Sequence, residues 1–127
     1  MIAIHDPVTV RAYGNLANRL LYDSIRNLKW ATATLNRAAN VILAMTEETP
    51  IMRVLWAQYR IHEARCRLNN EIRFIDSNMF ENLCTALDID HVRAYAALKR
   101  KYADKCRKAL ELAERADRLC AEYLKKS

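Results

Sequence analysis

Apolar residues recur along this chain at alternating spacings of three and four positions, which is the period of an amphipathic helix. In the first third, these positions are Leu21, Ile25, Leu28, Thr32, Leu35, Ala39 and Ile42. A second run comprises Ile51, Val54, Ile61, Leu68, Ile72 and Ile75, and a third comprises Tyr102, Cys106, Ala109, Ala113, Ala116, Cys120 and Tyr123. The pattern therefore predicts helices along the whole chain.

Helix-capping residues divide this pattern into four elements. Thr49 and Pro50, Asp76 and Ser77, and the acidic turn that ends in Asp90 are typical helix starts. The predicted helices span 7–45, 50–75, 77–87 and 90–124, and the first is expected to kink or break near Gly14. The short connection near Pro50 predicts that the two long helices are antiparallel.

The predicted fold is an all-α single-domain helical bundle over residues 1–127. Two long antiparallel helices are followed by a short helix and a long C-terminal helix, which together form a helix-turn-helix-like unit. Phe80 and Leu87 have the spacing expected of core residues that attach the short helix to the long ones. With one Gly and two Pro in 127 residues, the chain has little material for hairpins.

Composition argues against an enzyme. A single glycine excludes the glycine-rich phosphate loops and the nucleophile elbow, and none of the three histidines has an obvious partner. We therefore expect no catalytic residue and no cofactor. No stretch approaches the ~18 apolar residues of a membrane span, so a cytoplasmic protein without a membrane partner is expected.

The four cysteines, Cys66, Cys84, Cys106 and Cys120, are dispersed among apolar helical neighbours. This placement favours buried free thiols in a reducing compartment over disulfides. His62 and Cys66 are four positions apart and could share a metal ion, if Cys84 and His91 supplied two more ligands. Lone helical His and Cys residues are more often structural, so no metal site is predicted.

The whole positive charge excess of the chain lies between residues 93 and 108. The segments before and after this block are neutral, while the block itself holds seven Lys or Arg and one Asp. Such a concentration is a candidate footprint for phosphate, although a solvated helix face has the same composition. The candidate nucleic-acid-binding residues are Arg93, Lys99, Arg100, Lys101, Lys105 and Lys108.

Residues 74–90, followed by Val92 and Arg93, carry the phrase F-I-x-S-x-x-F-x-x-L-C-x-x-L-x-I-D. This phrase resembles the core of short all-helical proteins encoded by phages and prophages. The resemblance covers about twenty residues, and Asp88 replaces the glycine that is usual in that family. It implies a mobile-element origin and a helix-turn-helix-like core, and it names no ligand.

Two main functions follow as hypotheses. The first is a small phage-type regulator that binds duplex DNA through the basic helix. The second is a helical protein-binding module, such as an inhibitor or adaptor of a host complex or a binder of a phage protein; a virion assembly protein is a further alternative. Aromatic residues off the main apolar positions suggest a second apolar face and a homo-oligomer, most simply a dimer: Trp30, Trp56, Tyr59 and Tyr123.

Overall fold

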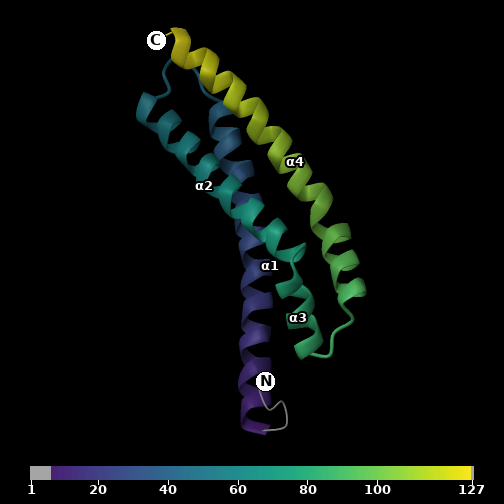
Figure 1. Cartoon of the computed structure of the whole chain (residues 1–127). Coiled ribbons are helices and arrows are strands. Elements are labelled where there is room, and N and C mark those ends of the chain that lie inside the picture. The colour runs from purple at the N-terminus through teal and green to yellow at the C-terminus, as the bar shows by residue number, and fades with distance from the viewer. Residues whose placement is uncertain (1–6, 127) are drawn as a thin grey trace.

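The computed structural model describes residues 7–126, and only the backbone at positions 7–10, 12 and 13. The described residues form four helices: α1 (Pro7–Leu43), α2 (Ile51–Ile75), α3 (Asn78–Ala86) and α4 (His91–Lys126). Figure 1 shows that α2 runs back beside α1, that α3 continues beyond the end of α2, and that α4 returns along α1. The all-α bundle and its antiparallel long helices are confirmed.

Each predicted helix is present, and each of its ends lies within two residues of the expected position. Residues 1–6 and 127 of the predicted domain lie outside the described residues. α1 continues through Gly14, so the helix is not broken at that position. One glycine costs a helix interior about 1 kcal/mol, which a helix of this length absorbs through its packing.

The helix starts follow the capping chemistry expected at two of the three junctions. The Ser77 hydroxyl accepts a hydrogen bond from the Phe80 amide at 3.4 Å, and Asp90 Oδ1 accepts one from the Arg93 amide at 3.2 Å. At the start of α2, the cap position is Pro50 itself, which has no side-chain cap. The Thr49 hydroxyl instead accepts from the Thr46 amide at 2.9 Å, within the turn.

The core lies where α1 meets α2 and α4, and many of its residues are small. Ala31, Ala39, Ala64, Ala109 and Ala113 are fully buried, which allows the three helix backbones to approach closely. Leucine and isoleucine side chains fill the spaces between them: Leu28, Leu35, Ile42, Ile61 and Leu68. α2 and α4 both pack mainly on α1 and touch each other much less.

α3 is attached to this core through Phe80, which is 2% exposed. Its ring meets Phe74 edge-on at 5.9 Å between centroids and His91 at 5.7 Å, so one side chain joins α2, α3 and α4. Leu87, at the C-terminal cap of α3, is only half-buried. The prediction of a core position is confirmed for Phe80 and wrong for Leu87, because the chain leaves the helix there.

Candidate functional site

The basic block occupies the N-terminal half of α4, on the positions outside its buried side. Tyr102, Cys106 and Ala109 face the core, so most of the cations between them point outward. Arg93, Arg100, Lys101 and Lys105 are all exposed. The structure therefore brings the predicted candidates to one region of a single helix.

Three cations of the block are held by carboxylates of the protein itself. Lys99 Nζ lies 3.5 Å from Asp76 Oδ1, to which the Tyr95 hydroxyl also donates at 2.8 Å. Asp104 accepts hydrogen bonds from Arg107 and Lys108, which lower the pKa of that carboxyl and raise the pKa of Arg107. Arg107 also reaches Glu111 at 3.4 Å.

Four candidates remain without a carboxylate partner among the described residues: Arg93, Arg100, Lys101 and Lys105. We call these four the α4 cationic stripe. Lys101 Nζ lies 5.6 Å from the centroid of the Tyr102 ring, which helps to position it. From first to last, the stripe covers about 18 Å of helix, at 1.5 Å per residue.

The turn between α3 and α4 bends at Asp88. This residue has a φ of 55°, in the left-handed region that glycine occupies most easily. The Ile89 amide donates to the Cys84 carbonyl at 2.8 Å, and the Asp88 amide donates to the Thr85 carbonyl at 3.1 Å. These two bonds form the Schellman motif that ends a helix and turns the chain sharply.

The proposed metal ligands are not assembled. His62 Nε2 and Cys66 Sγ are 3.8 Å apart on the exposed side of α2, whereas Cys84 is buried on the inner side of α3. Within residues 7–126, no group of three or more His, Cys, Asp or Glu is placed to hold a metal ion. All four thiols are free, but Cys66 is exposed, so its predicted burial is wrong: its position on α2 faces away from α1.

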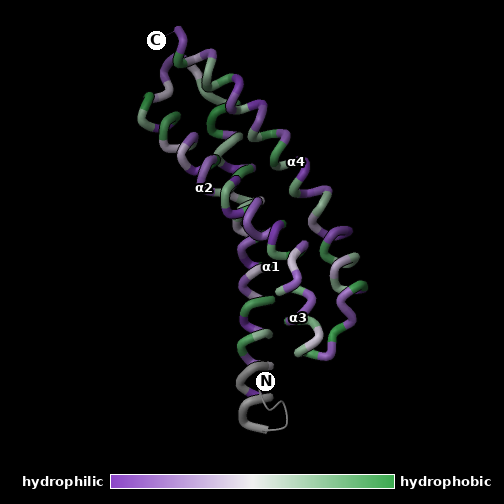
Figure 2. The backbone as a smooth tube through the Cα atoms, viewed as in Figure 1, coloured by the Kyte–Doolittle hydropathy of each residue, from purple (hydrophilic) through white to green (hydrophobic). Residues whose placement is uncertain are grey.

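A second surface lies on the outward side of α2, near its N-terminus. Met52, Leu55, Trp56 and Tyr59 are 71%, 38%, 63% and 53% exposed. Their spacing of i, i+3, i+4 and i+7 places them on one helix face, and the Trp56 and Tyr59 rings stack at 5.6 Å. Figure 2 shows green, hydrophobic segments at the start of α2, at the edge of the molecule, alternating with pale and purple ones.

We call these four residues the α2 apolar face. The sequence indicated Trp56 and Tyr59 as members of a second apolar face, but it did not single out Met52. The other two aromatic residues of that prediction, Trp30 and Tyr123, are half-buried against the core. Their positions off the main apolar spacing reflect contacts within the bundle.

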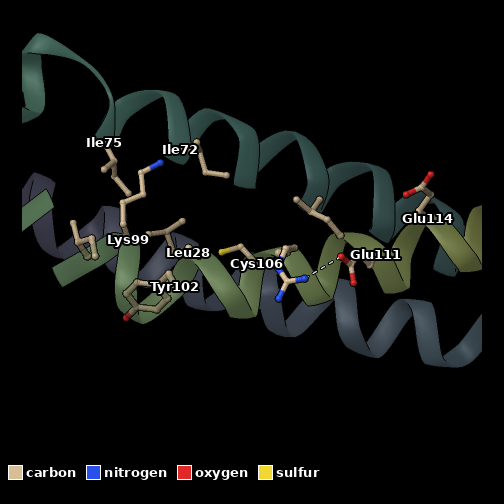
Figure 3. A pocket seen from close by; sticks show the side chains of 12 residues that line it. Leu28, Ile72, Ile75, Lys99, Tyr102, Cys106, Glu111 and Glu114 are labelled. Carbon is tan, nitrogen blue, oxygen red and sulfur yellow. Dashed lines mark hydrogen bonds and ion pairs between the residues drawn. The ribbon is translucent and has the colours of Figure 1, made fainter. Parts of the chain in front are cut away.

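The separation of α2 from α4 leaves an apolar groove of about 370 Å³ over α1. Figure 3 shows Ile72 and Ile75 on one side of it, Tyr102 and Cys106 on the other, and Leu28 between them. Lys99 and Glu111 lie at its edges, where both charge signs occur. The groove therefore has no single preference for an anion or a cation.

Comparison with known proteins identifies no relative of this chain. The chain matches no family model, no curated protein and no solved structure. None of the described helices is both long and apolar enough to cross a membrane. Function must therefore be inferred from the α4 cationic stripe, the α2 apolar face and their surroundings.

Proposed function

We propose that this chain is a non-enzymatic helical binding module, which docks a partner protein through the α2 apolar face. The observation that supports it is the exposure of four large apolar side chains in one continuous stripe, including two stacked aromatic rings. Contiguous apolar surface of this kind marks interaction sites, and aromatic residues contribute most of the binding energy in such interfaces.

The composition of α2 explains why this face is free. Val54, Ala57 and Ile61 already pack on α1, so the opposite side of the same helix has no partner within the bundle. A helix that needed only one apolar face would carry polar residues there. If the resemblance to phage-encoded proteins holds, the partner belongs to a host complex, and the chain acts on it as an inhibitor or adaptor.

Affinity capture from a lysate treated with nuclease tests this function, using Met52→Ser and Trp56→Ser as binding-face variants. Met79→Ser is the matched control, because Met79 is also a methionine exposed at 59% but lies on α3. We expect both α2 variants to lose a partner that the wild type and the Met79 variant retain. Equal capture by all four proteins would overturn the proposal, as would complete loss on nuclease treatment.

A second candidate function is binding to duplex DNA through the α4 cationic stripe. The observation that favours it is the set of four exposed cations without carboxylate partners along about 18 Å of helix. Against it stand Asp88 and Asp90, exposed at the start of the same helix, where phosphate contacts are expected. Salt dependence separates this candidate from docking through an apolar face.

A further inference from the structure

A small pocket of about 220 Å³ opens between α1 and α2, directly beside Trp56. Arg37 from α1 and Arg53 and Arg60 from α2 line it, together with Trp56 and Ala57. Three arginine side chains and one aromatic side chain therefore line one cavity at the edge of the α2 apolar face. We call it the arginine pocket.

Two of the three positive charges of the arginine pocket are not balanced by a carboxylate of the described residues. Arg60 is fixed by two contacts: it pairs with Glu63 at 3.0 Å, and its guanidinium carbon lies 5.3 Å from the centroid of the Trp30 ring. Arg37 and Arg53 are exposed and have no carboxylate partner among residues 7–126. Two uncompensated positive charges thus border a pocket that a third arginine helps to shape.

Thr34 provides a second, independent sign of a missing polar group. It lines the pocket and is 4% exposed, yet its hydroxyl has no hydrogen-bond partner. Thr32 on the same helix behaves differently, because its hydroxyl donates to the Leu28 carbonyl at 2.8 Å. A buried hydroxyl without a partner is rare, since its desolvation is uncompensated.

We propose that the arginine pocket receives the carboxylate of an Asp or Glu side chain, carried by an amphipathic helix of the partner protein. The apolar residues of that helix cover the α2 apolar face, and its acidic edge faces α1. Guanidinium groups bind carboxylates through paired, charge-assisted hydrogen bonds, and Arg37 and Arg53 have no carboxylate partner among the described residues to compete with such a ligand. This inference rests on the proposed function and adds the chemistry of the partner.

Charge also decides between such a partner and a second copy of this chain. α2 carries five arginines and two glutamates. One of those glutamates, Glu71, already accepts hydrogen bonds from Ser24 and Asn27 within the bundle. Two α2 helices packed face to face would bring arginines against arginines, with Glu63 as the main counter-charge. An acidic helix complements the same surface without this repulsion.

The test uses the fluorescence of Trp56, which becomes the only tryptophan in a Trp30→Phe background because the chain contains two. The probe is a blocked helical peptide of about four turns, long enough to cover the face. It carries leucines at i, i+3, i+4 and i+7 and glutamates along one edge. A second peptide has glutamine in place of every glutamate.

We expect the glutamate peptide to shift the Trp56 emission saturably to the blue, and the glutamine peptide to bind about tenfold to a hundredfold more weakly, as for a lost charged hydrogen bond. In the double variant Arg37→Gln/Arg53→Gln, this preference should fall to about twofold or less. The matched control is Arg115→Gln/Arg118→Gln, which removes two exposed arginines from α4 and should retain the preference.

Three results would overturn the inference: equal binding of both peptides, no binding of either, or a preference that survives the loss of Arg37 and Arg53. Equal binding would mean that the α2 apolar face docks a partner whose acidic residues do not contribute to the affinity. The proposed function is decided separately, by the Met52 and Trp56 capture experiment. A Trp56 shift that depends on protein concentration without peptide would identify a second copy as the occupant.

Discussion

Asp88 holds a left-handed backbone at the one sharp turn between α3 and α4. Its amide and that of Ile89 close the Schellman motif, so the turn needs this conformation whatever residue stands there. Aspartate tolerates the left-handed region better than most residues, but glycine adopts it without steric cost. The residue therefore stores a small strain that a substitution can release.

We expect Asp88→Gly to raise the free energy of unfolding by about 0.5–1 kcal/mol, as the released strain exceeds the added entropy of the unfolded chain. Asp90→Ala removes the same charge two positions later, and there the loss of the cap should cost about 1 kcal/mol. Urea denaturation of both variants measures the difference. A destabilised Asp88→Gly protein would show that the aspartate side chain has a role beyond the turn.

The four cysteines differ in exposure, which predicts their reactivity. Cys66 is exposed, while Cys84, Cys106 and Cys120 are buried, and burial raises the pKa of the Cys84 and Cys120 thiols. Because the thiolate is the reactive form, iodoacetamide should modify one thiol quickly in the folded protein and four after denaturation. Cys66→Ser should remove the fast reaction. Two or more fast thiols would contradict the burial described here.

At the scale of elements, α3 packs on the bundle through one aromatic side chain, Phe80, and through the smaller buried side chains Leu83 and Cys84. Phe80 touches both neighbouring helices through Phe74 and His91, whereas Leu87 is half-buried at the helix end. We expect Phe80→Ala to cost about 3–5 kcal/mol, as for other buried aromatic residues, and Leu87→Ala to cost clearly less. Thermal unfolding followed by circular dichroism compares the two. Similar costs would mean that α3 is held by its whole apolar side.

The sequence predicted the helices well because their apolar spacing and caps are local features. Ser77 and Asp90 cap their helices as expected, since a cap needs only the amides of the next turn. α1 continues through Gly14 because the packing of the whole helix outweighs one unfavourable residue. Helix periodicity alone could not show whether Cys66 faces a neighbour or solvent, because α2 is apolar on two sides.

The candidate site was predicted less completely, for a physical reason. The basic block is a local feature, and its outward positions follow from the buried side of α4. The pairing of Lys99 with Asp76 joins two helices, and no spacing within one helix indicates it. The arginine pocket is also tertiary, because Arg37 and Arg53 come from different helices and Thr34 is buried only by their packing.

If the α4 cationic stripe binds duplex DNA, four phosphate contacts give a slope of about −3.6 in log K against log salt. Lys101→Ala/Lys105→Ala should then reduce the slope to about −1.8 and weaken binding to all sequences alike. Lys125→Ala/Lys126→Ala is the control, because both lysines are exposed at the far end of α4. Absence of binding at about 50 mM salt would rule out this candidate.

At the scale of the whole molecule, α1 is the element on which the other helices assemble. α2 and α4 pack on it along different sides, which leaves the outward side of α2 and the outward side of α4 as separate surfaces (Figure 1). One of these is apolar with arginines at its edge, and the other is cationic. Added salt should therefore weaken anion binding at the α4 cationic stripe but strengthen the pairing of two α2 apolar faces, whose arginines repel each other.

Self-association provides the test of this difference. Two α2 apolar faces attract each other through Trp56 and Met52, but their arginines repel at low salt. Added salt shortens the Debye length from about 10 Å at 0.1 M to about 3 Å at 1 M and so removes the repulsion without weakening the apolar contact. We expect light scattering to give a monomer mass at low salt and a rising mass at high salt, and Trp56→Ser to abolish the rise. A stable dimer already present at low salt, and lost in the Trp56 variant, would mean that the charges on α2 do not prevent pairing and that a second copy occupies the face.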